Sequence, residues 1–119
     1  MQTLIQNVQA FNSFVEQLKF QDAQKFYSDD IISVENEDLP TIGLSAKIEK
    51  GKAFAENFID ISAELKNSII SDDMSVTEWR YQFTNKQTGE KADFNQLSLQ
   101  RWRDGKIIHE RHHYKTDKW

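Results

Sequence analysis

The sequence contains no cysteine, and it has only one proline and four glycines among 119 residues. Without cysteine, the chain can form no disulfide bond, supply no thiolate nucleophile and build no zinc site from sulfur ligands. No internal repeat, low-complexity tract or linker divides it. Its length therefore fits one domain that spans residues 1–119.

The sequence also lacks a basic segment and a long apolar run. Its 15 Lys and Arg residues are scattered among 19 Asp and Glu residues, for a formal net charge of −4. Nucleic-acid binders carry a basic patch or stripe, so we expect no nucleic-acid partner. Residues 1–20 alternate polar and apolar positions and show neither a signal peptide nor a membrane span. We therefore expect a cytoplasmic protein that does not bind membranes, which the absence of cysteine also fits.

Apolar residues in the N-terminal half recur at helical spacing. Intervals of four, three, four and three residues predict an amphipathic helix over residues 3–20, with Leu4, Val8, Phe11, Val15 and Leu18 on one face. A second, short helix is expected over residues 22–27, a strand over 31–36, and a loop over 37–45 that holds the only proline. A third helix is expected to run to about Lys66, because intervals of four, three and four separate Phe54, Phe58, Ile61 and Leu65.

From residue 67 onward the apolar period changes to two, which is typical of strands. Three long strands are expected over about residues 68–84, 90–103 and 106–115. The dipeptide Asp104-Gly105 between the last two is typical of tight hairpins. Helices followed by an antiparallel meander predict an α+β domain in which the helices pack on one face of the sheet.

Four segments stand in the same order as in a known family: Phe26–Asp30, Ser33–Glu35, Thr84–Glu90, and Trp102–Ile108 with Glu110 and Tyr114. On these segments the chain resembles the SnoaL-like proteins of the NTF2-like superfamily over nearly its whole length. The resemblance implies a cystatin-like cone, in which N-terminal helices pack on a strongly curved, mainly antiparallel sheet and a ligand pocket opens at one end. The family includes ketosteroid isomerases, polyketide cyclases and binding domains without catalytic activity, so the fold alone does not fix the function.

Period-two alternation assigns strand residues to the two faces of the sheet. One set is aromatic or apolar and alternates with charged and polar residues, so we expect it on the concave face: Thr77, Trp79, Tyr81 and Phe83. On the next strand, Leu97 and Leu99 share a face opposite to that of Gln96, Ser98 and Gln100.

The last hairpin leaves two frames open. A two-residue turn would place on the face of Gln100 the residues His109, Arg111 and His113. A three-residue turn, with Gly105 in the left-handed conformation, would instead place there Glu110, His112 and Tyr114. The resemblance favours the second frame. Leu97 and Leu99 then point outward, as a homodimer interface through the sheet would require.

Three residues are candidates for acid–base catalysis. The resemblance places Glu35 where ketosteroid isomerases carry a general base, and an apolar pocket would suit its carboxyl group to proton transfer. It places His112 where relatives carry a catalytic carboxylate, and a histidine there can act as acid or base. Glu110, on the same face, can orient His112 and stabilise its charge, or it can form a salt bridge with Arg101 or Arg111.

The expected ligand is a small apolar or aromatic molecule that bears a polar oxygen. Its pocket would be lined by Tyr27, Trp79, Tyr81, Gln96, Ser98, Gln100, Trp102 and Tyr114. We expect no cofactor and no metal, because His109 and His113 share a strand face that His112 does not. Phe11 and Ser98 stand where the resemblance expects a Tyr and an Asp that stabilise an oxyanion, which argues against ketosteroid isomerase activity.

Two functions remain open at this stage. The domain could be an isomerase, lyase or hydrolase that uses Glu35 with His112. It could equally be a non-catalytic binding or protein-interaction module that dimerises through the sheet.

Overall fold

The computed structural model describes residues 3–115 and begins with helix α1, Leu4–Glu16. Thr3 caps this helix, since its hydroxyl accepts a hydrogen bond from the Gln6 backbone while the Gln6 side chain accepts one from the Thr3 backbone. The predicted apolar stripe faces the core through Val8, Phe11 and Val15. The helix ends four residues before the predicted Phe20, because Leu18 adopts a left-handed conformation with φ of 61°.

The next elements follow the predicted order with shifted bounds. The second helix is a single α-helical turn, α2 (Phe20–Ala23), that continues as the 3₁₀ turn η1 (Gln24–Phe26). Strand β1 covers Tyr27–Glu35, so it begins earlier than predicted. The short strand β2 (Thr41–Ile42) lies within the predicted loop, and α3 covers Leu44–Asn57.

The prediction that the third helix continues to Lys66 is wrong. The chain leaves the helix at Asn57, and Phe58–Ser71 forms strand β3. Its pairing with the next strand shifts between Ile59 and Ser62 and again between Leu65 and Asn67. These irregularities break the period of two, so the apolar residues fall at intervals that imitate a helix.

The predicted single strand over residues 68–84 is two strands. After β3 the chain turns at Asp72-Asp73, where Asp72 has φ of 54°, and returns as β4 (Met74–Asn85). This turn lacks Gly, Pro and Asn, so the sequence gives only a weak signal for it, although aspartate tolerates the left-handed region. Strands β5 (Lys91–Arg103) and β6 (Lys106–Tyr114) follow as predicted.

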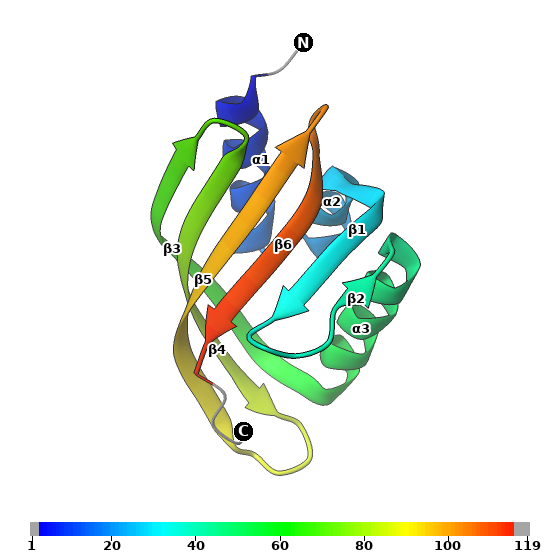
Figure 1. Cartoon of the computed structure of the whole chain (residues 1–119). Helices are drawn as coiled ribbons and strands as arrows, with labels where there is room; N and C mark the ends of the chain where they lie inside the picture. Colours follow the sequence, from blue (N-terminus) through cyan, green and yellow to red (C-terminus); the bar gives the residue numbers. More distant parts are fainter. Residues whose placement is uncertain (1–2, 116–119) are drawn as a thin grey trace.

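The six strands form one sheet in the order β2-β1-β6-β5-β4-β3 (Figure 1). Only β1 and β6 pair in parallel, so the sheet is mixed but mainly antiparallel. Figure 1 shows a strongly twisted sheet with the helices gathered on one side of it. The predicted α+β arrangement is confirmed.

The last hairpin has the predicted frame but not the predicted turn. Asp104 and Gly105 both have positive φ and form a two-residue turn, with Arg103 opposite Lys106. The register then shifts between Trp102 and Arg101, which leaves Ile108 as an extra residue in β6. This bulge pairs Gln100 with Glu110, Ser98 with His112, and Gln96 with Tyr114.

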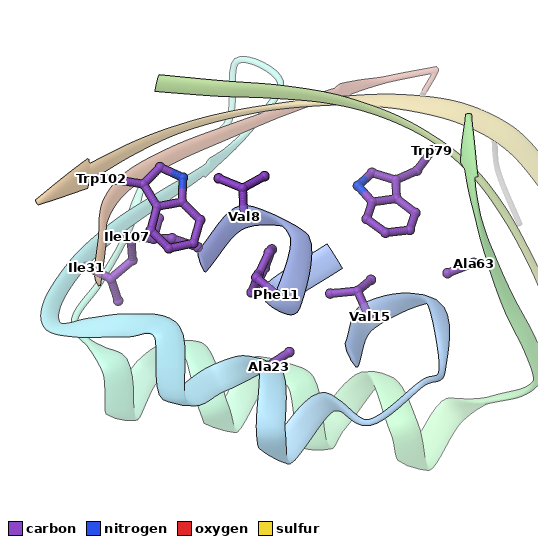
Figure 2. Packing of buried hydrophobic residues seen from close by; sticks show 9 residues of the cluster. All are labelled: Val8, Phe11, Val15, Ala23, Ile31, Ala63, Trp79, Trp102 and Ile107. Atoms are coloured by element: carbon purple, nitrogen blue, oxygen red, sulfur yellow. The ribbon is translucent and has the colours of Figure 1, made fainter. Parts of the chain in front are cut away.

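The core lies between the sheet and α1 (Figure 2). It consists of Val8, Phe11, Val15, Ala23, Ile31, Ala63, Trp79, Trp102 and Ile107. Trp79 and Trp102, which we expected to line the pocket, are 2% and 4% exposed and belong to this core. The Trp102 indole also donates to the Ser75 hydroxyl at 3.0 Å, so it has a structural role whether or not a ligand touches it.

Candidate functional site

One carboxylate, that of Glu110 on β6, is completely enclosed on the concave face of the sheet. Its Oε1 atom accepts hydrogen bonds from the Tyr27 hydroxyl at 3.1 Å and from the Gln100 amide at 2.9 Å. Its Oε2 atom accepts one from the Ser33 hydroxyl at 2.8 Å. The neighbouring strands β1 and β5 bring these donors to Glu110, because β6 lies between them.

Two nitrogen donors complete the surroundings of Glu110. The Lys47 ammonium, from α3, pairs with Oε2, and the His112 Nε2 atom lies 3.2 Å from the same oxygen. Lys47 Nζ also lies 4.6 Å from the centre of the Tyr27 ring, a cation–π contact. Helix α3 therefore places a positive charge beside a carboxylate that would be costly to bury unpaired.

More hydrogen-bond donors surround the Glu110 carboxylate than it can accept at one time. An ionised carboxylate offers about four lone-pair sites, two on each oxygen. Three donors converge on Oε2 alone, from Ser33, Lys47 and His112. The Lys47 and His112 side chains are 24% and 14% exposed, whereas Ser33 is buried. One of the two more accessible donors can therefore turn to a ligand without leaving Glu110 unpaired.

Glu110 is ionised at neutral pH. Burial by itself would raise the pKa of Glu110, but the interactions of the carboxylate with His112 and Lys47 outweigh this effect and hold that pKa well below its usual range. Burial and the adjacent Glu110 charge raise the pKa of Tyr27 well above that of a free tyrosine, so its hydroxyl stays a donor. An ionised carboxylate only accepts hydrogen bonds, and we therefore assign a proton to His112 Nε2.

The second ring nitrogen of His112 faces β5. Nδ1 lies 2.8 Å from the Ser98 hydroxyl and 3.3 Å from the Gln96 amide nitrogen. The Gln96 amide also donates to the Ser98 oxygen at 3.1 Å, so the Ser98 proton is directed at Nδ1. In the tautomer that carries its proton on Nε2, His112 has its basic lone pair on Nδ1. Carboxylate, imidazole and hydroxyl form the chain Glu110–His112–Ser98, an arrangement suited to proton transfer.

The predicted contact between Glu110 and His112 is confirmed, and the alternative salt bridges are not formed. Arg101 instead pairs with Asp73 at 3.1 Å on the other face of the sheet. The expectation that Glu35 lies in an apolar pocket is wrong, because this residue is exposed at the end of β1.

Glu35 still lies close to the site. It stands opposite His112 in the parallel pairing of β1 and β6. Burial, and after it the Glu35 charge, raises the pKa of Tyr114 to about 12. Glu35 therefore acts on the electrostatics of the rim rather than on the enclosed cluster.

Aromatic side chains continue the concave face beyond Gln96. Tyr81 lies 5.9 Å from Trp79 and 6.1 Å from Phe94, and Phe94 lies 5.2 Å from Tyr114, measured between ring centres. Burial raises the pKa of Tyr81, so it remains a neutral donor. The prediction that Trp79, Tyr81 and Phe83 share the concave side is confirmed, while their contact with a ligand stays a prediction.

Sequence reasoning missed two members of the cluster, Lys47 and Ser33. A signal for Lys47 was present, since it lies three residues after Leu44 and one before Ile48 on the apolar side of a predicted helix. A lysine in such a stripe either extends to solvent or pairs with a buried acid. Ser33 shares a face with the buried Ile31, which marks it as inward-facing but not as a partner of Glu110.

Two open depressions lie away from this cluster. One borders the β3–β4 turn and includes Ile69, Asp73 and Arg101; the other adjoins it and includes Asn7, Trp102 and Gly105. Over residues 3–115, three or more His, Asp or Glu side chains nowhere come together as a metal site. Within the same range, every helix is too short or too polar to cross a membrane.

A curved α+β domain with an enclosed acid–base cluster is an architecture of small-molecule enzymes and binding proteins. A profile of the SnoaL-like polyketide cyclase family matches residues 5–116. The chain therefore belongs to this family, and the resemblance stated from its sequence is confirmed.

Solved structures share the fold at low sequence identity. A proposed SnoaL-like polyketide cyclase from Mesorhizobium loti is 23% identical, with a TM-score of 0.84 over 93% of this chain and 98% of that one. An NTF2-like protein from Burkholderia thailandensis is 16% identical, with a TM-score of 0.87 over 97% and 92%. A protein of ketosteroid isomerase-like fold from Catenulispora acidiphila, in complex with trimethylamine, is 13% identical, with a TM-score of 0.79 over 95% and 88%. No curated protein matches the chain.

Proposed function

We propose that this chain binds a small apolar or aromatic molecule that bears a polar oxygen, and that it catalyses proton transfer on that molecule. His112 is the proton-transferring residue, and Glu110 is the positioning residue that holds its imidazole. The observation that carries the proposal is the contact of 3.2 Å between His112 Nε2 and a completely enclosed carboxylate, with Nδ1 directed at Ser98. The acid–base partner of His112 is thus Glu110 and not Glu35.

The proton would move along the hydrogen bonds of this cluster. A proton leaves an acidic O–H or C–H group of the ligand and reaches His112 Nδ1, either directly or through the Ser98 hydroxyl, which passes its own proton on. The resulting imidazolium lies between Ser98 and ionised Glu110, which stabilises it. The proton then returns to a different carbon of the ligand, which completes an isomerisation, or to the oxygen of a hydroxyl group that leaves as water when its C–O bond breaks, which completes an elimination. Lys47, the surplus donor, can hydrogen-bond the ligand oxygen as it gains negative charge.

The family supports a ligand of this size. The related protein from Catenulispora acidiphila was solved with trimethylamine, a small molecule. The aromatic side chains Tyr81, Phe94 and Tyr114 next to the cluster suit an apolar or aromatic body. A cytoplasmic location fits the cysteine-free sequence and is part of the same proposal.

Deuterium exchange tests this function without knowledge of the natural substrate. The aromatic ketone 2-tetralone has acidic C–H groups, and its exchange in D₂O is followed by NMR. We expect wild-type protein to accelerate exchange and His112→Gln to slow the catalysed exchange by about 100-fold or more. Glu35→Gln is the matched control and should exchange like wild type. Equal rates for wild type and His112→Gln would reject the catalytic role of His112.

A specific observation also favours the second candidate, a homodimer formed through the sheet. Leu97 is 45% exposed and Ile32 is 36% exposed on the face opposite to Glu110. This face lies away from the site, so dimerisation and binding are compatible. Sedimentation of wild type and Leu97→Lys tests it: we expect a dimer that the lysine dissociates. A monomeric wild type at all concentrations would reject the interface.

A further inference from the structure

Two buried polar side chains on the concave side have a polar atom that is not hydrogen-bonded. Thr77 on β4 is completely enclosed, and Asn12 on α1 is 3% exposed. Within residues 3–115, neither the Thr77 hydroxyl nor the Asn12 Oδ1 atom has a hydrogen-bond partner. Buried polar groups in folded proteins are nearly always paired, so two such atoms in one region need an explanation.

Both side chains adjoin one row of paired strand residues, which begins with Ser68 on β3 and Thr77 on β4. The Asn12 amide nitrogen donates to the Ser68 hydroxyl at 3.5 Å, and Ser68 stands directly opposite Thr77 in the pairing of β3 with β4. Neighbouring strands are separated by ~4.8 Å, so the Asn12 and Thr77 side chains both adjoin that of Ser68. Asn12 reaches this residue from α1, which packs against β3.

This row leads to the proposed catalytic cluster. Thr77 stands opposite Ser98, and Ser98 stands opposite His112, whose Nδ1 atom its hydroxyl contacts. At the other end of the row, Ser68 is exposed on the edge strand β3, so solvent reaches the row there. The row thus connects an accessible edge of the cone with the enclosed imidazole.

Another residue of β4, Ser75, shows that a hydroxyl group can be buried here and still have a hydrogen-bond partner within the protein. Ser75 is as enclosed as Thr77 and lies two residues away, on the same face of β4. Its oxygen accepts a hydrogen bond from the Trp102 indole at 3.0 Å. The core therefore supplies a hydrogen-bond partner for Ser75. Thr77 and Asn12 are left to pair with a group that is not part of the protein.

We propose that Asn12 and Thr77 form a subsite for a hydroxyl group of the ligand, an inference that rests on the proposed function and narrows its ligand to an apolar alcohol or phenol. The ligand hydroxyl donates to Asn12 Oδ1 and accepts from Thr77. If the Asn12 amide is turned, the directions reverse, and a hydroxyl still satisfies both residues because it donates and accepts. The ligand oxygen then lies one strand from Ser98, beside the path to His112.

Phenol and toluene are the probes, because they have the same shape and differ in the hydroxyl. Each is titrated into the wild-type protein while NMR follows the side-chain amide signals of Asn12 and the imidazole signals of His112. We expect phenol, and not toluene, to shift the Asn12 signals. Thr77→Val should weaken phenol binding by about fivefold or more and raise Tm, since it removes an unpaired hydroxyl without changing the shape. Ser75→Ala should lower Tm and bind phenol like wild type.

The outcomes separate this subsite from the proposed function. If phenol shifts His112 but not Asn12, the subsite is wrong and the acid–base site stands. If phenol shifts neither residue, the subsite is rejected, and the exchange of 2-tetralone decides the catalytic role on its own. If Thr77→Val lowers Tm, or if it binds phenol as tightly as wild type, the Thr77 hydroxyl serves the fold and the subsite is rejected.

Discussion

The two halves of the concave face treat their buried polar groups in opposite ways. On the side of β6, Glu110 receives five donors from β1, α3, β5 and its own strand. On the side of β4, Thr77 and Asn12 each keep a polar atom that nothing within residues 3–115 pairs. The first half pairs its buried carboxylate fully without a ligand and holds a charge in place. The second half bears a cost in stability that a binding partner can remove.

The largest effect in this comparison is expected at Glu110. Glu110→Leu leaves Lys47 next to an apolar side chain and removes the acceptor of Tyr27, Ser33 and Gln100. Loss of one partner of a buried ion pair costs about 3–5 kcal/mol, and we expect a decrease of that size in the free energy of unfolding. Urea denaturation measures it, with Glu35→Leu as an exposed control that should change little. A loss below about 1 kcal/mol, the range of surface pairs, would show that the network stabilises nothing.

The pH dependence of stability tests the same charge. The pKa of Glu110 is lower in the folded protein than the value of about 4.3 in an unfolded chain. Its contribution to stability is therefore present above that unfolded pKa and disappears as the pH falls through the lower folded pKa. We expect Glu110→Gln to be less stable than wild type at pH 7 and to lose less stability between pH 5 and acid, by about 1.4 kcal/mol for each pH unit that separates the folded from the unfolded pKa of Glu110. Parallel curves for the two proteins would contradict the assignment.

Lys47 should be less important than Glu110, because Glu110 has a surplus of donors. Lys47→Met keeps the apolar stem and removes the ammonium, which leaves four donors around the carboxylate. A hydrogen bond to a charged group contributes about 1.5–3 kcal/mol, and we expect a loss toward the lower end of that range in urea denaturation. A loss as large as that of Glu110→Leu would mean that Lys47 is indispensable and not free to bind a ligand.

The smallest effect, and one of opposite sign, is expected on the other half. Asn12→Leu exchanges a half-paired amide for an apolar side chain of similar size next to Val8 and Val15. Because an unpaired buried polar group costs about 1–3 kcal/mol, we expect a gain of about 1 kcal/mol in the free energy of unfolding. The same type of replacement thus destabilises at Glu110 and stabilises at Asn12. A destabilised Asn12→Leu would remove the contrast between the two halves.

The sequence predicts the parts of this molecule that depend on regular repetition. The apolar stripe of α1 and the alternation of β4 follow their periods closely, and the pairing of Glu110 with His112 follows from their separation of two residues along one strand. Prediction from the sequence fails where a local irregularity breaks the period of two along a strand. Asp60 has φ of 55° within β3, and the register shifts around it turn a strand into an apparent helix.

The composition of the site depends on contacts that no local pattern records. Ser33 lies 77 residues from Glu110 in the sequence, and only the parallel pairing of β1 with β6 brings them together. Likewise, whether a buried hydroxyl is satisfied depends on its neighbours in space, so Ser75 and Thr77 look alike in the sequence and differ in the structure.

The bulge at Ile108 shifts by one residue which side chains of β6 face the interior. If Ile108 were paired as an ordinary strand residue, the alternation that begins at Lys106 would continue unbroken, and every later residue of β6 would change sides. Glu110 and His112 would then face water, while His109, Arg111 and His113 would enter the interior, where Lys47 would meet further positive charge instead of a carboxylate. The acid–base character of the domain thus depends on this bulge as much as on the identity of its residues. Deletion of Ile108, which removes the bulge and keeps the later pairing, should therefore be better tolerated than the insertion of a further residue at the same place.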